Sequence, residues 1–220
     1  MTRRAVDADD RQARRSGILE AARSLFLEGD GELPIAAEVA TRAGLAKGTV
    51  YLYFKTKEEI FAQLLLEGWS PIMRAAYTIF SPRKGSRSKK VGAYIALTVE
   101  HLAGHPELLR LDALSAGVIE KNMTAEALLD YKRQFHERLV GAGACIDEAL
   151  RLDSGRGVVI LTRTYALTRG LWQTAQHHEE SICAAEFASP AKMTLAQFPK
   201  ELMEALSEYW RGALAVERLH

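Results

Sequence analysis

The sequence has little cysteine and no long apolar run, and each absence argues against a class of protein. Its two cysteines, Cys145 and Cys183, are too few for a disulfide framework and follow no metal-ligand spacing. A reducing, cytoplasmic environment is therefore the simpler interpretation. No charge-free stretch of about 18 apolar residues occurs, so we expect no membrane span. The opening residues, MTRRAVDADDRQARR, lack an apolar core, so we expect no secretory signal there.

An excess of charge of one sign is also missing. The 29 basic and 28 acidic residues give a formal net charge of +1. Affinity for an anionic polymer would therefore have to come from a local cluster of basic residues. The stretch RAGLAKGTVYLYFKTKEEIF, residues 42–61, is such a cluster. It places Lys47, Lys55 and Lys57 among aromatic residues and contains no acid before Glu58.

Side chains suited to catalysis or metal binding do not gather in a recognisable pattern. His101 and His105 have the i, i+4 spacing of a metal site, but Gly104 and Pro106 predict a helix break between them. The HHEE run at 177–180 is more typical of a solvated helix end, where the helix dipole favours histidine. No Ser/His/Asp or Cys/His set has a supporting context. We therefore expect no catalytic residue, no metal site and no cofactor.

Apolar residues recur at helical spacing along most of the chain, and no segment shows clean strand alternation. Glycine and proline separate the predicted elements. The predicted fold is all-α with about nine helices. They are expected at 10–28, 35–44, 46–54, 56–80, 89–103, 106–118, 124–151, 156–177 and 194–216.

These helices divide into two predicted domains. Residues 1–55 would form a small three-helix domain with an N-terminal arm of about residues 1–9, and residues 56–220 a larger helical domain. Thr56 and Glu59 have the spacing of a capping box at the start of the long fourth helix. That helix would be shared by the two domains.

The run EVATRAGLAKGTV has the spacing of a helix-turn-helix motif. Ala40 supplies the small residue needed where the two helices cross, and Gly44 suits a tight turn through positive φ. Val50 on the second helix would face back to the core, which Val39 and Leu45 complete. Three constraints at fixed offsets thus indicate a helix-turn-helix unit.

The second helix of this motif would present polar and aromatic side chains to DNA, because the N-terminal residues of such a helix meet base edges in the major groove. Lys47 can donate to guanine acceptors, and Thr49 offers a hydroxyl and a methyl group. Gly48 would allow the backbone to approach a phosphate, and tyrosines could hydrogen-bond to phosphates or stack on sugars. The predicted DNA-binding residues are Lys47, Gly48, Thr49, Tyr51, Tyr53 and Lys57.

The alternative for this stretch is a solvated basic face with Tyr51 and Phe54 in a core. We assign Phe54 to the core beneath the helix. We assign Lys55 to solvent, because a lone lysine on a loop is usually just hydrated.

The stretch GILEAARSLFLEGDGELPIAAEVATRAGLAKGTVYLYFKTKEEIFAQLL resembles the DNA-binding domain of the tetracycline-repressor (TetR) family over about residues 14–66. The resemblance rests on a first helix ending in LF, the VA…AG pair and the run KGTVYLYFKTKEEIF. The chain departs from the family at PIAA, where the family usually has Ser or Thr. Ile35 and Ala36 cannot make a hydroxyl-to-phosphate contact, although backbone amides there could bind phosphate.

This resemblance implies a ligand-responsive transcription regulator, most often a repressor, that binds double-stranded DNA as a homodimer at a near-palindromic operator. It implies that the C-terminal domain binds a small-molecule inducer, whose identity the sequence does not reveal, and dimerises through its last two long helices. A transcriptional activator of the same fold is one alternative. A helical small-molecule-binding protein or enzyme with an incidental helix-turn-helix is another.

The last two predicted helices favour dimerisation by their own pattern. A helix that is apolar over a wide arc needs two partners, and the helix over 194–216 has such an arc. Gly157 and Gly170 in the preceding helix would allow close approach, so two helices per chain could form a four-helix interface. The alternative is an intramolecular core. The stripe consists of Leu195, Phe198, Leu202, Leu206, Tyr209, Ala213 and Val216, widened by Met203, Trp210 and Leu214.

A ligand cavity is predicted between the fourth helix and the later ones. A ligand there could shift the spacing of two DNA-reading heads through its differential affinity for two states. The alternative is that the same aromatic and methionine side chains are core, since pockets are also mostly apolar. The candidate walls are Trp69, Met73, Tyr77, His101, Phe135, Tyr165 and Trp172.

Overall fold

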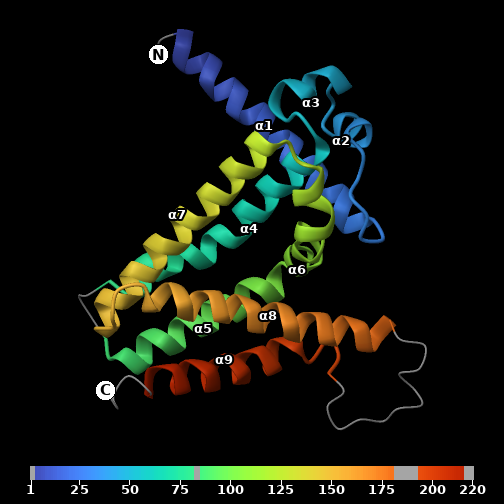
Figure 1. Ribbon diagram of the computed structural model, residues 1–220. Coiled ribbons are helices and arrows are strands. Elements are labelled where there is room, and N and C mark those ends of the chain that lie inside the picture. Colours follow the sequence, from blue (N-terminus) through green and yellow to red (C-terminus); the bar gives the residue numbers. More distant parts are fainter. Residues whose placement is uncertain (1–2, 82–84, 181–192, 216–220) are drawn as a thin grey trace. The chain divides into compact units, whose positions relative to one another are not determined.

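The computed structural model describes residues 3–81, 85–180 and 193–215. Within these ranges the chain forms nine α-helices and no strand, which confirms the all-α prediction (Figure 1). The helices are α1 (Arg3–Glu28), α2 (Ala36–Arg42), α3 (Lys47–Tyr53), α4 (Lys57–Ile79), α5 (Arg87–Gly104), α6 (Pro106–Ala113), α7 (Ala125–Leu150), α8 (Arg156–Glu180) and α9 (Phe198–Ala215).

Two helices differ from their predicted bounds by five residues or more at one end. α1 begins at Arg3, so residues 3–9 of the predicted arm continue this helix, because no glycine or proline interrupts them. The helix predicted over 106–118 ends at Ala113 and passes into a short π-helix, Ser115–Ile119. Gly117, a poor helix former, lies within that irregular turn.

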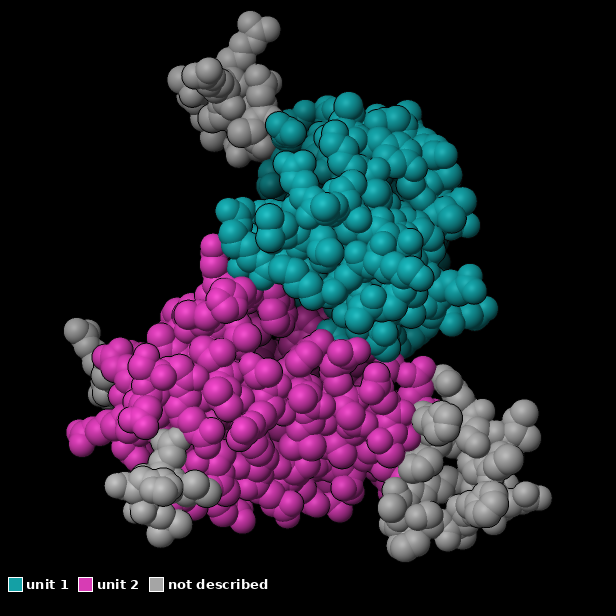
Figure 2. Space-filling model, viewed as in Figure 1, with its two compact units in different colours: residues 1–68, 110–134 teal, residues 69–109, 135–220 magenta. Residues whose placement is uncertain are grey.

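The chain divides into two compact units (Figure 2). The first comprises residues 1–68 and 110–134, and the second comprises residues 69–109 and 135–220. Three helices, α4, α6 and α7, therefore continue from one unit into the other. This division by packing differs from the predicted functional boundary at residue 55, which stays a prediction.

The first unit is built around apolar side chains of α1, α2, α3 and α4. Ile18 and Phe26 of α1 are buried, and Phe26 lies 6.1 Å from Phe61 of α4, measured between ring centroids. Arg110 of α6 donates to the backbone carbonyl of Gly29 at 3.0 Å and lies over the Phe26 ring. The end of α1 is thus held by a residue far along the chain.

The second unit contains a layer in which α9 packs against both α5 and α8 (Figure 1). An aromatic cluster joins the three helices. The ring of Trp210 stacks on Phe80 at 6.1 Å and lies 5.6 Å from Tyr94. The Trp210 indole Nε1 donates to the Thr164 hydroxyl on α8 at 3.0 Å. Burial of Tyr94 raises the pKa of its phenol.

The helical hairpin of α7 and α8 depends on glycine. A Cβ on Gly157 would collide with the backbone carbonyl of Gly143, and a Cβ on Gly143 would collide with Val158. The Asp147 carboxylate accepts hydrogen bonds from the backbone N–H of Gly157 at 2.5 Å and of Gly155 at 2.8 Å. Gly157 thus serves a close approach within the chain.

None of the helices in the described ranges is both long enough and apolar enough to cross a membrane.

Candidate nucleic-acid interface

The predicted helix-turn-helix is present as α2, a tight turn and α3. Gly44 follows the last turn of α2 and has a φ of +68°. This backbone conformation is sterically unfavourable for any residue that carries a Cβ, so glycine suits the position. The backbone N–H of Leu45 donates to the Ala40 carbonyl at 2.9 Å and closes the turn. Ala40, Val39 and Val50 are buried. The sequence therefore fixes the angle between α2 and α3 by a turn residue and a small core.

Little of the surface of α3 packs against the rest of the chain. Val50 is its one buried residue. Lys47 and Gly48 are exposed, and Thr49 and Tyr53 are half-buried. Tyr51 is 40% exposed, and the Lys47 ammonium lies 6.0 Å from the centroid of its ring.

Phe54, which follows α3, lies where the core interpretation put it. It is 4% exposed, and the Arg15 guanidinium of α1 lies 5.0 Å above its ring. The basic stretch that contains α3 is therefore divided: Val50 and Phe54 face the core, and the remaining side chains of α3 reach solvent to different degrees.

The start of α2, one side of α3 and the start of α4 surround a hollow of about 470 Å³. Lys47, Lys55 and Lys57 all line it, together with Tyr51 and Thr56. The Lys57 ammonium donates to the Leu33 carbonyl at 3.4 Å, so part of its hydrogen-bonding capacity is used within the chain. Glu58 lines the hollow as well, so three lysines and one carboxylate leave it with a net positive charge, which the composition of the whole chain lacks.

Lys55 is the residue that sequence reasoning set aside and the structure places beside the other lysines. It is exposed, and its backbone N–H donates to the Glu59 carboxylate at 2.7 Å. The Thr56 hydroxyl accepts from the backbone N–H of Glu59 at 3.3 Å, which is one of the two bonds of the predicted capping box; the Glu59 carboxylate accepts from Lys55 and not from Thr56. This cap fixes the turn that carries Lys55, although no pattern in the sequence shows that the turn faces α3.

α2 begins without a side-chain cap. Its N-cap residue is Ile35, and the backbone N–H of Ile35 donates to the Glu38 carboxylate at 3.0 Å. Ile35 is 53% exposed. Ala36 and Ala37, the first two residues of α2, line the lysine hollow. The missing hydroxyl at the helix start thus leaves backbone amides as the donors there.

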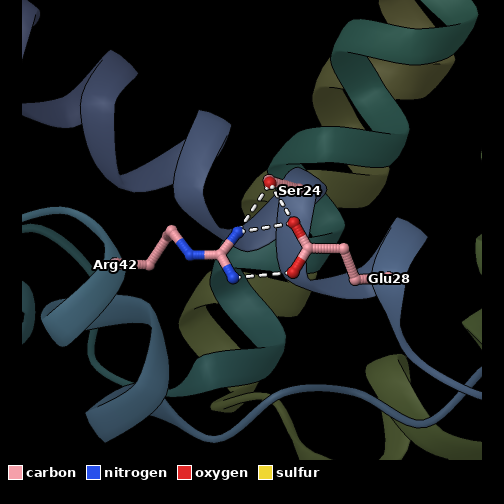
Figure 3. Close-up of polar contacts among 3 residues, drawn as sticks. All are labelled: Ser24, Glu28 and Arg42. Atoms are coloured by element: carbon pink, nitrogen blue, oxygen red, sulfur yellow. Dashed lines mark hydrogen bonds and ion pairs between the residues drawn. The ribbon is translucent and has the colours of Figure 1, made fainter.

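A clamp between α1 and α2 was not predicted from the sequence. The Arg42 guanidinium makes a two-pronged pair with the Glu28 carboxylate, at 2.6 and 2.7 Å, and also donates to the Ser24 hydroxyl at 2.8 Å (Figure 3). Hydrogen bonds from Arg42 and Ser24 lower the pKa of Glu28 from its ordinary 4.5 to about 2. The pair orients α2 on α1 and so positions the motif.

The predicted ligand-site residues all lie in the second unit. Trp69 and Tyr165 are in contact, with ring centroids 5.2 Å apart and the rings edge to face. Trp69, Met73 and Trp172 are buried, whereas Tyr77 is 47% exposed. His101 and Phe135 are half-buried. Whether these side chains wall a cavity or form core stays a prediction.

Polar groups lie near these aromatics that the sequence did not single out. Arg138 of α7 donates to the Ser70 hydroxyl of α4 at 3.0 Å, and the Arg169 guanidinium lies 5.6 Å from the Tyr165 ring centroid. The Tyr77 hydroxyl lies against Gly141, where a Cβ would strike it. The His101 and His105 rings are 4.3 Å apart. Among the described residues no three His, Cys, Asp or Glu side chains come together as a metal site.

A helix-turn-helix whose second helix carries exposed basic and aromatic residues, on an otherwise helical chain, defines a helical DNA-binding regulator. Comparison with known families agrees. Residues 18–64 match the family described as "Bacterial regulatory proteins, tetR family", and residues 65–217 match the family described as "Tetracyclin repressor-like, C-terminal domain". The chain belongs to the TetR family of transcriptional regulators, which are ligand-responsive DNA-binding proteins.

Individual relatives resemble parts or all of the chain. The HTH-type transcriptional regulator YfiR of Bacillus subtilis is 35% identical over 63 residues. That match covers 29% of this chain and 31% of the length of that curated relative.

Solved structures share the fold at low identity. A protein assigned to the TetR family from Mesorhizobium loti matches with a TM-score of 0.60 at 18% identity, over 98% of each chain. SmeT, the repressor of the multidrug efflux pump SmeDEF of Stenotrophomonas maltophilia, gives 0.58 at 19% identity, over 90% of this chain and 89% of its own. FadR of Bacillus subtilis, solved with stearoyl-CoA, matches with a TM-score of 0.51 at 21% identity, over 87% of this chain and 96% of its own.

Proposed function

We propose that this chain is a repressor that binds a near-palindromic DNA operator as a homodimer and leaves it when a small-molecule inducer binds. The observation that carries the proposal is the exposed face of α3 beside the lysine hollow. Its positive charge, exposed tyrosine and small residues suit a DNA groove and its phosphates. A transcriptional activator that binds DNA through the same surface is the second candidate.

The side chains of α3 divide by the part of DNA that they can reach. Lys47 and Thr49, in the first turn, would meet base edges, because the N-terminal residues of a recognition helix lie deepest in the major groove. Gly48 has open space around it and would let the backbone approach a phosphate. Tyr51 and Tyr53 would contact phosphates and sugars.

Lysines around the hollow would hold the adjacent backbone phosphates. We extend the predicted set to Lys55, which is exposed and lines the hollow with Lys47. Lys57 would contribute less, because its ammonium already donates to the Leu33 carbonyl. Backbone amides of Ala36 and Ala37 would take the place of the hydroxyl contacts that the family usually makes at the start of α2.

The homodimer interface is proposed on the last two long helices, α8 and α9, with α8 at its centre. The apolar arc of α9 no longer argues for a second chain, because its two partners are α5 and α8 of the same chain. Phe198, Leu202, Leu206 and Trp210 are buried there. The opposite side of α8 is exposed between residues 159 and 174, and it carries small and polar side chains. These are Val159, Thr162, Arg163, Ala166, Gly170, Gln173 and Thr174.

Gly170 on this face differs from Gly143 and Gly157, which pack closely against other parts of the chain. A Cβ on Gly170 would meet no other atom of the described structure within 4 Å. A glycine in the middle of a helix costs stability unless something approaches it closely. A second copy of α8 would supply such an approach.

Replacement of Ala166 or Gly170 by arginine tests this interface. A large charged side chain on the small-residue face should convert the dimer to monomer, which sedimentation velocity would measure. Glu100→Arg, on the exposed side of α5 and outside the proposed interface, is the control and should leave the dimer intact. If the control variant dissociates the dimer and the two α8 variants do not, α8 is not part of the interface.

The inducer is proposed to bind in the second unit, near Trp69 and Tyr165. It would favour a spacing of the two reading heads that no longer fits the operator half-sites, through its different affinity for the two states. Helices α4, α6 and α7 run through both units and are the elements that could carry the change. We infer further that the protein acts in the cytoplasm and catalyses no reaction; turnover of a metabolite by a variant that cannot bind DNA would contradict the second inference.

A gel shift with the promoter regions of the gene itself and of its neighbours tests DNA binding. Combined replacement of Lys47, Thr49 and Tyr51 by alanine should weaken operator binding by more than about 100-fold, since each contact contributes roughly 1–3 kcal/mol. Lys89→Ala removes the same charge from an exposed site on α5 and is the control. A folded triple variant that binds as tightly as the parent would disprove the site.

A further inference from the structure

A pocket of about 430 Å³ lies between α5 and α9 within the second unit. Its walls are the first turns of α5 and the last turns of α9, helices that run side by side (Figure 1). The volume falls in the range of small-molecule sites. None of the side chains predicted above as ligand walls lines this pocket, so it is a separate candidate site.

Two arginines line the pocket from different helices. Arg87 comes from the first turn of α5 and Arg211 from the last part of α9. Both are exposed. Within the described part of the chain, neither guanidinium forms an ion pair or a hydrogen bond, and no acidic residue lines the pocket. Two uncompensated guanidinium groups at one cavity favour an anionic ligand.

Hydroxyl groups and the helix end add to this preference. Ser88 has no hydrogen-bond partner among the described residues and can donate to an anion. Ser207 donates to the Met203 carbonyl at 2.7 Å, and so can still accept. The N-terminus of α5 favours negative charge, whereas the C-terminus of α9 opposes it. The positive charge of the pocket therefore comes from the two arginines.

The rest of the lining is apolar. Val91 and Ile95 follow the charged turn along α5, and Ile95 is 2% exposed, so it forms part of the buried wall. Leu214 faces them from α9 and is half-buried. A ligand held by its charge at Arg87 and Arg211 would therefore lay an apolar body along these side chains.

We propose that this pocket binds an amphipathic anion, with a carboxylate or phosphate head between Arg87 and Arg211 and an apolar body along Val91, Ile95 and Leu214. The head would accept charge-assisted hydrogen bonds from both guanidinium groups. The body would remove apolar surface of the pocket from water. The site lies outside the DNA-binding helices, because its residues belong to α5 and α9, so its ligand can be tested without DNA.

Isothermal titration of the full chain without DNA tests the proposal. The probes are decanoate, decyl phosphate and decanol, each below its micelle concentration. Decanoate or decyl phosphate should bind, and decanol should bind at least about tenfold more weakly, because it lacks the charge. The tighter of the two anions identifies the head group. Equal affinity for decanol and both anions would overturn the assignment of the arginines.

Variants separate this pocket from other sites. Arg87→Gln with Arg211→Gln should weaken anion binding about tenfold or more and leave decanol binding unchanged. Lys89→Gln with Lys200→Gln changes the same net charge on the same two helices, outside the pocket, and should have no effect. An equal loss in this control would show nonspecific charge attraction and contradict the site.

Gly92→Leu tests the cavity itself. Gly92 lines the pocket, and a Cβ there meets no atom within 4 Å, so the variant should fold and fill the space. It should abolish binding of all three probes. Tyr77→Ala, at the other candidate site, should leave binding unchanged. If Tyr77→Ala removes binding and Gly92→Leu does not, the ligand occupies the other site and the proposal is wrong.

Discussion

Helices α3 and α9 are covered by the chain to very different extents. α3 buries Val50 alone and leaves Leu52 73% exposed and Tyr51 40% exposed. α9 buries a complete stripe, which includes Trp210 with no exposed surface. A short helix with uncovered aromatic and basic side chains offers them to an outside partner, whereas a long covered helix stabilises its own domain. The difference separates the residues that should affect binding from those that should affect folding.

Replacement of Trp210 by alanine should have the largest effect on stability. The side chain is fully buried against Phe80 and Tyr94, and its indole donates to Thr164. Loss of a buried aromatic ring costs about 3–5 kcal/mol. Urea denaturation should show this loss in the free energy of unfolding. The matched variant Leu52→Ala on α3 should change it by less than about 0.5 kcal/mol; a larger loss would mean that α3 is covered within the chain.

Two glycines of the reading motif should respond in opposite directions. Gly44→Ala forces a side chain into positive φ and should cost about 1–2 kcal/mol of stability. Gly48→Ala lies in α3 with open space and should be neutral or stabilise by up to about 1 kcal/mol. Thermal unfolding would measure both.

DNA binding sharpens the comparison of these two glycines. Gly48→Ala should weaken operator binding although it does not weaken the fold, because its methyl group lies where a phosphate would approach. Unchanged operator affinity in this variant would place the backbone of Gly48 away from the DNA.

The clamp of α1 and α2 should produce a smaller effect that depends on pH. The pKa of Glu28 is lowered in the folded protein, so the ionised carboxylate is the form that stabilises the fold. Its contribution is fully present above the ordinary value of 4.5 and is lost as the pH falls through about 2. Arg42→Gln should lower the midpoint of thermal unfolding at neutral pH, and the difference from the parent should shrink across that window. A difference that stays constant with pH would exclude the pair as its cause.

The features that the sequence predicted well depend on neighbours a few residues apart. The positive φ of Gly44, the burial of Val50 and the hydrogen bond from the Glu59 amide to the Thr56 hydroxyl each depend on a fixed local offset. The same locality explains most helix bounds, since glycine and proline stop a helix where they stand. The family resemblance also rests on this compact stretch, where few changes are compatible with both the turn and the groove.

The features that the sequence did not predict join residues far apart in the chain. Arg42 forms an ion pair with Glu28 on the preceding helix, and no sequence periodicity relates the two residues. The wide apolar arc of α9 was correctly recognised as needing two partners, but a pattern cannot tell whether these belong to the same chain. They are α5 and α8. The pocket of Arg87 and Arg211 has the same origin, because it exists only once α5 and α9 are packed.

The hairpin of α7 and α8 has a consequence for how the protein folds. Its two helices are joined by a short turn, and the Asp147 carboxylate accepts hydrogen bonds from the amides of Gly155 in the turn and Gly157 in α8, so these contacts close a small loop. Short loops lose little chain entropy on closing, and local contacts form early. We expect this hairpin to form before α9 packs against α5, whose partner residues are distant in the chain. Pulsed hydrogen exchange during refolding should therefore show protection of α7 and α8 amides ahead of those in α9.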